Sequence, residues 1–299
     1  MLIPIAGRVS YLPGSNNIGV VATGDGGAII VDSGIDKDAG RAIRKALDAA
    51  KLTLRAIVNT HHHADHIGGN DFLLRNVPGI QVYAPPLEAA LIANPLLEPV
   101  YLSLGAAPPA AMQSKFVMAK GSPVHHLIEG ELLTIEGVEL GVVTLHGHSL
   151  GQLGVRMDGV LLAADGFFGR AIVAKHVLPY AQEIGGQLAS LDTIAGGDDD
   201  FALPSHGELL GRDALGETLA ANRDAVLAGS DAVAAALSQP GDLASIGRRV
   251  RATLGLGQTN VAAYAVYLSG ISAHLTYLAS RGRAALECGE DGLVWRAVA

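Results

Sequence analysis

The sequence predicts a protein of the α/β class, because short apolar runs typical of strands alternate with amphipathic helical segments. Residues 28–31 and 54–59 read as strands, and the segment 37–51 between them places Ile43 and Leu47 on one helical face. Hydrophobic residues make up 49% of the 299 residues, and charged residues make up only 17%. This composition predicts a large buried core and argues against disorder.

The N-terminal part of the chain is expected to form strands first, and then alternating helices and strands. The run Gly24-Asp25-Gly26-Gly27 is typical of a hairpin turn, because glycine accepts the positive φ angles that such turns require. The expected strands are 9–12, 18–21, 28–31, 54–59 and 80–84, and the expected helices are 37–51, 71–76 and 87–93.

Residues 94–118 interrupt this alternation. Pro95, Pro99, Pro108 and Pro109 divide an otherwise apolar stretch into short pieces. Long irregular insertions in compact domains often serve as lids or pocket walls. We therefore expect this segment to line an apolar substrate pocket, with a dimer contact or a core helix as the alternatives.

Strand patterns return after residue 131. Tight turns at Glu136-Gly137 and around Asp158-Gly159 predict two hairpins. The expected strands are 132–135, 138–145, 161–164 and 203–204, and a helix that carries Leu188, Leu191 and Ile194 precedes the last of them.

The C-terminal part of the chain is expected to be mainly helical. Helical spacing continues to residue 238, and Gln239-Pro240-Gly241-Asp242 reads as a break. The chain is therefore divided into a main domain, residues 1–238, and a C-terminal extension, residues 239–299. The extension is expected to contain helices at 243–254 and 261–280 and a hairpin at 285–298, which turns at Gly289-Glu290-Asp291-Gly292.

Charge and cysteine content restrict the partners and the compartment. The net charge of −8 disfavours nucleic acid and anionic membranes as partners. The single Cys288 excludes an internal disulfide and suits a reducing cytosol, so a cytoplasmic protein is expected. No charged residue lies between Arg251 and Arg281, but polar residues interrupt this stretch, which favours a buried or interface helix over a membrane span. A homodimer remains open.

A cluster of metal-binding side chains follows the expected strand 54–59. His61, His63, Asp65 and His66 lie within six residues. Imidazole and carboxylate groups suit zinc and related divalent metals. The spacing aims His61 and His63 at one point and lets Asp65 and His66 reach a second, which predicts two adjacent metals. The alternative is a solvent-exposed histidine-rich loop.

The pattern His61-x-His63-x-Asp65-His66 after an apolar strand resembles that of the metallo-β-lactamase superfamily. The flanking Thr60 and Gly68-Gly69-Asn70 resemble its glyoxalase II-like and lactonase-like hydrolases. This resemblance implies a four-layer αβ/βα sandwich with further ligands downstream. Segments similar to the family's Gly-His-Thr-Pro-Gly, Gly-Asp and Pro-Gly-His-Gly motifs supply His148, Asp165 and His206, each after an expected strand.

The resemblance also assigns the ligands to two metal ions. Zinc is preferred, and manganese or iron are alternatives. The first ion is held by His61, His63 and His148, the second by Asp65, His66 and His206, and Asp165 bridges them together with a shared water or hydroxide.

Two residues receive roles beyond metal binding. Asp65 is the expected catalytic residue, because a carboxylate there can accept the proton of the hydroxide. Asp32 is expected behind the ligand loop, which it would hold by hydrogen bonds, with an ordinary turn or helix cap as the alternative. His146 is read as an ordinary residue outside the ligand set. The alternative is that it supports the ligands, because it lies two residues before His148 and would share the same side of an extended strand.

We therefore expect a dinuclear metal-dependent hydrolase that uses a metal-bridging hydroxide to cleave an ester, thioester or lactone with an apolar part. Residues 166–176 lack the Cys-Gly-Lys/Arg element of glyoxalase II, and Phe168 stands where some lactonases have tyrosine. Asp165 argues against a specialised β-lactamase. One alternative is a phosphodiesterase or nuclease that uses arginines of the C-terminal extension, whose helix before a two-stranded hairpin resembles the winged-helix tails of some superfamily members. The other is a mononuclear iron enzyme similar to persulfide dioxygenases.

Overall fold

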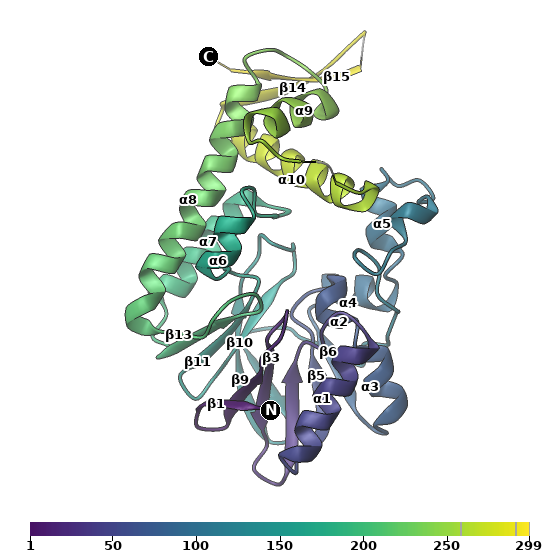
Figure 1. Ribbon diagram of the computed structural model, residues 1–299, viewed down its shortest axis with the longest axis vertical. Coiled ribbons are helices and arrows are strands. Elements are labelled where there is room, and N and C mark those ends of the chain that lie inside the picture. Colours follow the sequence, from purple (N-terminus) through teal and green to yellow (C-terminus); the bar gives the residue numbers. More distant parts are fainter. Residues whose placement is uncertain (258, 291, 299) are drawn as a thin grey trace.

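The computed structural model describes residues 1–257, 259–290 and 292–298. Two sheets form the centre of the lower part of the molecule, helices lie on their outer sides, and the C-terminal helices extend above them (Figure 1). The predicted α/β class and the predicted four layers are therefore confirmed.

The first sheet has the strand order β1-β2-β3-β4-β5-β6-β7. Its first four strands pair antiparallel, whereas β4 to β7 pair parallel. Parallel neighbours need crossover connections, and the helices expected between these strands provide them. The strands are β1 (Ile3–Ala6), β2 (Val9–Leu12), β3 (Ile18–Ala22), β4 (Gly27–Val31), β5 (Thr53–Val58), β6 (Gln81–Ala84) and β7 (His126–Leu127).

The second sheet has the strand order β13-β12-β11-β10-β9-β8. Only β11 and β12 pair parallel among these strands. The strands are β8 (Leu132–Ile135), β9 (Val138–Thr144), β10 (Leu153–Met157), β11 (Val160–Ala164), β12 (Phe201–Pro204) and β13 (Leu210–Gly211). A separate hairpin of β14 (Ala284–Gly289) and β15 (Gly292–Ala297) follows the last helix; Asp291 of its predicted turn lies outside the described residues.

The long helices that the sequence predicts are all present among the described residues, with ends shifted by a few positions. The short elements β1, β13, α2, α5 and α6 are not predicted, because so few residues carry little periodicity. The helices are α1 (Lys37–Ala49), α2 (Ala64–Ile67), α3 (Asn70–Asn76), α4 (Pro86–Ala93), α5 (Leu97–Leu102), η1 (Ala110–Met112), α6 (Arg170–Lys175), α7 (Ile184–Gly196), α8 (Arg212–Ala236), α9 (Leu243–Thr253) and α10 (Val261–Ser280).

Alternate residues of the buried strands face different layers, as the pleat of a strand requires. In β4, Ile29 packs into the core between the two sheets, whereas Ile30 packs against α1 and α3. In β11, Leu162 joins the core between the sheets, and Leu161 packs against α7 and α8. Strands that are buried on both faces need apolar residues at every position, which explains the continuous apolar runs in the sequence.

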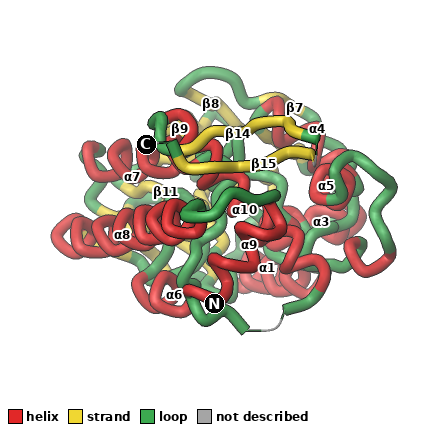
Figure 2. The backbone as a smooth tube through the Cα atoms, turned by 90° about the horizontal axis from the view of Figure 1, so that it is seen from above, coloured by secondary structure: helices red, strands yellow, loops and turns green. Residues whose placement is uncertain are grey.

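Helix α10 connects the C-terminal extension to the rest of the molecule. It packs against α8 and α9 at one end and approaches α5 at the other (Figure 1). Viewed from above, β14 and β15 lie across the C-terminal helices (Figure 2). By length and composition alone α10 could cross a membrane, and 39% of its most apolar window is buried inside the protein. The contacts of α10 with α8, α9 and α5 are those of a helix that packs against other helices of the same protein.

His274 of α10 is buried against α8 and carries a testable consequence for acid stability. Its Nδ1 lies 2.9 Å from the Ser230 hydroxyl, and its side chain is 1% exposed. Burial lowers the pKa of His274 from 6.5 to about 4, because the charged imidazolium loses its hydration there. Between pH 6.5 and pH 4 the unfolded chain therefore binds a proton that the folded chain does not.

The free energy of unfolding is expected to fall by up to about 3 kcal/mol over this interval through His274 alone. Below about pH 4 both states are protonated, and this contribution stops changing. The measurement is urea unfolding of the wild type and of His274→Gln at pH 7 and pH 4.5. The variant should lose less stability on acidification than the wild type, and equal losses would contradict this reading.

Candidate metal centre

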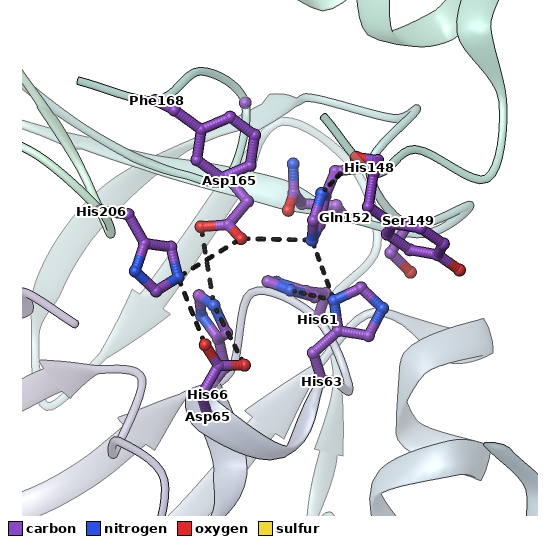
Figure 3. Close-up of polar contacts among 12 residues, drawn as sticks. His61, His63, Asp65, His66, His148, Ser149, Gln152, Asp165, Phe168 and His206 are labelled. Atoms are coloured by element: carbon purple, nitrogen blue, oxygen red, sulfur yellow. Dashed lines mark hydrogen bonds and ion pairs between the residues drawn. The ribbon is translucent and has the colours of Figure 1, made fainter. Parts of the chain in front are cut away.

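The first predicted ligands occupy the loop that leaves β5. The backbone passes from Val58 at the end of the strand through His61 and His63 into the short helix α2, which carries Asp65 and His66. These side chains point toward one centre, where they meet His148, Asp165 and His206 from the second sheet (Figure 3). The structure therefore brings all seven predicted ligand residues together.

Three imidazole nitrogens converge at one side of this centre. Nε2 of His61 lies 3.1 Å from Nδ1 of His63, which lies 2.9 Å from Nε2 of His148. The ligand atoms of these three residues lie within 4.8 Å of one another, as a tridentate site requires. This trio corresponds to the first metal position that the resemblance implies.

Hydrogen bonds on the far side of two rings determine which nitrogen faces the centre. The Thr60 hydroxyl donates to Asp32 Oδ2 over 2.8 Å, so its oxygen is left to accept from Nδ1–H of His61 at 3.0 Å. Nδ1 of His148 donates to the backbone oxygen of Tyr180 over 3.0 Å. Both rings therefore present an unprotonated Nε2 inward, which is the form that binds a metal.

The second group consists of Asp65, His66 and His206, whose ligand atoms also lie within 4.8 Å of one another. Nδ1 of His206 donates to the backbone oxygen of Ser15 over 2.9 Å, which directs its Nε2 to the centre. Asp165 lies between the two groups. Its Oδ2 is 3.2 Å from Nε2 of His148, and its Oδ1 is 3.6 Å from Nε2 of His66.

Electrostatics differ between the two groups. Burial lowers the pKa of His61 and His63 well below 6.5, and the neighbouring histidines lower both further. Burial alone would lower the pKa of His66, but Asp165, Asp32 and Asp65 raise it well above its usual value. The first group thus offers neutral nitrogens, while the second group is surrounded by carboxylates.

Asp32 lies behind the ligand loop. Its Oδ1 accepts from the Thr60 backbone N–H at 2.9 Å, and its Oδ2 lies 2.8 Å from Nδ1 of His66. The residue is buried and has φ 65°, a left-handed conformation that aspartate tolerates better than most residues. Asp32 thereby links the end of β4 to both ends of the loop.

Positive φ angles precede two of the three ligands of the second sheet, His148 and Asp165. Gly147, before His148, has φ 129°, and a Cβ there would lie 2.1 Å from the Gln187 nitrogen. Ala164, directly before Asp165, has φ 50° and is fully buried. Glycine adopts such an angle without strain, whereas for Ala164 it costs of order 1–3 kcal/mol, and strained residues of this kind cluster at functional sites.

Glu88 of α4 ties the first ligand loop to the loop that carries His148. One carboxylate oxygen accepts from the backbone N–H of His62 at 3.0 Å and contacts its Nδ1. The other accepts from the Ser149 hydroxyl at 2.6 Å and the Gly151 N–H at 2.7 Å. The sequence does not predict this role, although Glu88 stands out as an acid in an apolar helix.

Asn16 is the second residue that the sequence analysis misses. Its Nδ2 lies 3.1 Å from Asp65 Oδ2 and 3.4 Å from Nε2 of His206. The adjacent Asn17 donates to the backbone oxygens of Pro204 and Gly207 over 3.0 and 2.7 Å. The turn between β2 and β3, which belongs to the first sheet, thus supports the second group of ligands and the segment of the second sheet that carries His206.

A cavity of about 620 Å³ opens at the ligand cluster. Most of its wall comes from the segment 168–180 and from α10, and the insertion 94–118 supplies Glu98, Phe116 and Val117. The prediction that the insertion lines an apolar pocket is therefore only partly confirmed. Burial raises the pKa of the Glu98 carboxyl well above its usual value, with added repulsion from Asp65 and Glu88.

The remaining histidines lie outside the ligand set. His62 faces Glu88 and places Nε2 3.3 Å from the Tyr101 hydroxyl. The side chain of His146 is exposed, as an ordinary surface histidine would be, and β9 already ends at Thr144, so the alternative in which His146 supports the ligands is not favoured.

The family model described as the Metallo-beta-lactamase superfamily matches residues 11–206, which span all seven ligand positions. The chain belongs to this superfamily. The predicted family is thereby confirmed, together with its four-layer fold.

Curated superfamily relatives match in part. Hydroxyacylglutathione hydrolase of Methylobacillus flagellatus is 33% identical over 146 residues, 48% of this chain and 44% of that protein. Hydroxyacylglutathione hydrolase of Vibrio campbellii is 31% identical over 153 residues, 51% of this chain and 47% of that protein. The chain thus spans about half the length of the curated relatives it matches.

Solved structures of the superfamily match over nearly the whole chain. A beta-lactamase domain protein from Burkholderia ambifaria has a TM-score of 0.71 at 22% identity, covering 99% of this chain and 95% of that one. A metallo-beta-lactamase family protein from Thermus thermophilus has a TM-score of 0.70 at 20% identity, covering 99% of this chain and 97% of that one. This likeness in fold includes the C-terminal extension.

The donor set fits divalent metal ions. Asp165 Oδ1 is buried and has no hydrogen-bond partner among the described residues. Buried carboxylate oxygens are normally satisfied, so such an atom suits a bound cation. The three converging nitrogens of His61, His63 and His148 point to the same conclusion. Nε2 of His61 and Nε2 of His148 are both acceptors, and Nδ1 of His63 can donate its single proton fully to only one of them.

Proposed function

We propose that the protein is a dinuclear metal-dependent hydrolase that cleaves an ester, thioester or lactone. The observation that carries the proposal is the convergence of two ligand groups, joined by Asp165, at the mouth of a largely apolar cavity. The partial match to hydroxyacylglutathione hydrolases supports an acyl bond as the target.

His61, His63 and His148 would hold one ion, Asp65, His66 and His206 would hold the other, and Asp165 would bind both. Imidazole nitrogens with carboxylates favour zinc, and manganese or iron also fit. Ions held there would supply Lewis-acid chemistry, because bound divalent metals lower the pKa of water toward about 7 and polarise a carbonyl.

The chain's own residues would position groups and move protons. Asp65 lines the cavity, and its carboxylate can take up the proton released when the carbonyl is attacked. Asn16 donates to Asp65 Oδ2 and so fixes the direction of that carboxylate. Asp32 holds Thr60 and His66 in place, which keeps the ligand loop in its metal-binding conformation.

A nucleic-acid substrate is the less favoured alternative. Arg251 lies 5.4 Å over the ring of Tyr267, and Arg281 lies 5.3 Å over the ring of Tyr277. Arg249 donates to the backbone oxygens of Gln239 and Pro240. These arginines of the extension are engaged with their own chain, which supports a structural role.

The assignment of the ligands is tested by a pair of histidine variants. His148→Ala is expected to lose metal and to reduce turnover at least about a hundredfold. His146→Ala is the matched control, because its side chain is exposed two residues away, and it should keep both properties. Metal content is measured by elemental analysis, and turnover with esters, thioesters and lactones.

The wild type should carry about two zinc or manganese ions per chain. A chelator should abolish turnover, and added metal should restore it. About one iron per chain with oxygen-dependent turnover would instead favour the mononuclear alternative. Cleavage of bis(p-nitrophenyl) phosphate without cleavage of any acyl bond would favour a phosphodiesterase.

The remaining expectations about organisation and location form part of this proposal. We take residues 1–238 as the catalytic domain and 239–299 as its extension, and we expect a small-molecule substrate without a membrane partner. A single, exposed Cys288 is compatible with the reducing cytosol. A homodimer would be detected by light scattering of the purified protein.

A further inference from the structure

The cavity at the ligand cluster continues to helix α10, where its wall is made of small and apolar residues. Ala263, Val266, Tyr267 and Gly270 of this helix line the cavity. They are spaced three and four residues apart, so they form one face of α10. This face looks into the same space as the ligands His63 and His148, which also line the cavity.

Tyr180 spans the distance between the ligands and α10. Its ring lies 5.7 Å from the ring of His63 and 5.6 Å from the ring of His148. Its Cδ2 would lie 3.7 Å from a Cβ at Gly270. A continuous path beside one aromatic ring therefore leads from the ligand cluster to the face of α10.

Gly270 leaves room that a side chain would fill. A Cβ there would meet only Tyr180 within 4 Å, at an ordinary van der Waals distance. By contrast, a Cβ at Gly229 of α8 would lie 2.6 Å from Leu178, and one at Gly247 of α9 would lie 2.7 Å from Leu268. Close packing explains those two glycines, whereas Gly270 borders the cavity.

A glycine inside a helix destabilises it relative to alanine, and Gly270 has neither a positive φ nor a close neighbour to require it. What its missing side chain preserves is open space in the cavity. Gly270 is buried, so this space faces the interior of the site and not the solvent.

We propose that this space binds a linear apolar acyl chain of the substrate, and that Gly270 keeps the path for the chain open. The inference rests on the proposed function. From Ala263 to Gly270 the helix rises about 10 Å at 1.5 Å per residue. An extended chain advances about 1.2 Å per bond, so the wall matches a chain of about eight bonds.

The test compares chain-length profiles of Gly270 variants with that of the metal-loaded wild type. The probes are acetyl, butanoyl, hexanoyl, octanoyl and decanoyl thioesters of N-acetylcysteamine, the matching p-nitrophenyl esters, and γ-lactones with alkyl chains of the same lengths. For the wild type, kcat/KM should rise about fourfold per added methylene up to octanoyl, which corresponds to about 0.8 kcal/mol per buried CH₂.

The octanoyl-to-acetyl ratio of kcat/KM should fall in order of side-chain size, modestly in Gly270→Ala and at least about tenfold in Gly270→Leu. Gly216→Leu is the control, because Gly216 lies in α8 and, apart from the adjacent residues and backbone of that helix, no atom lies within 4 Å of its Cβ position. That variant should keep the wild-type ratio. Thermal melts check folding, and Gly270→Ala supplies the readout if Gly270→Leu does not fold.

Two results would overturn the inference in different ways. Cleavage of short and long chains at equal rates, or an unchanged ratio in both Gly270 variants, would refute the acyl-chain site and leave the proposed hydrolase intact. Failure of the metal-loaded wild type to cleave any of the three series would refute the proposed function itself.

Discussion

Asp65→Ala is expected to reduce kcat/KM by at least about a thousandfold, because the residue is proposed both to bind a metal and to accept a proton. General acid–base groups contribute about 10²–10⁴ in rate, and loss of a metal ligand adds to this. The fold should remain, since the carboxylate faces the cavity and carries no core packing. The measurement combines kcat/KM, metal content and a thermal melt.

A second variant separates the two roles of this residue. Asp65→Asn keeps an oxygen that can bind metal but cannot take up a proton, so it should retain about two ions and still lose turnover about a hundredfold. Asp38→Ala, at an exposed position of α1, is the surface control and should match the wild type within about twofold. Full activity in Asp65→Asn would remove the proton-transfer role.

Glu88→Leu is expected to lower the free energy of unfolding by about 3–5 kcal/mol, the cost of removing one partner from a buried charged network. Burial alone would raise the pKa of Glu88, but His62, Ser149 and the Gly151 N–H hold it below its usual value. The side chain is therefore an ionised acceptor, and its removal leaves buried donors unsatisfied.

The same variant should also lose metal affinity, because His62 lies between two predicted ligands and Ser149 directly follows a third. Urea unfolding and metal titration measure the two effects. Glu139→Leu on the exposed face of β9 is the control, and its stability should change by less than about 0.5 kcal/mol. If Glu88→Leu behaved like this control, the Glu88 carboxylate would not be needed to hold the two ligand loops together.

The ligand residues are predictable from the sequence because each follows an apolar strand, and strand ends in a layered α/β fold meet at one edge. The same logic locates β5, β9, β11 and β12 to within a residue or two. Local patterns decide these features, since a short strand, a turn and a motif all lie within about ten residues.

Contacts between distant segments are not predictable in this way. Glu88 meets Ser149, and Asn16 approaches His206, only after both sheets have assembled. The spacing of α10 predicts a helix, but not which surface the helix covers, because its residues are apolar nearly all round. A similar difficulty arises at short range for His146. Alternate residues share a side only within a strand, and β9 already ends at Thr144.

The two ligand groups have one further consequence for a chain with a single cysteine. Each group combines residues of the first sheet with a residue of the second: His61 and His63 with His148, and Asp65 and His66 with His206. Bound ions would therefore act as cross-links between the two halves of the sandwich, in the way that disulfides staple secreted domains. Unfolding of the loaded protein would require the two halves to release the ions before they separate. The unfolding rate should therefore fall as the metal concentration rises.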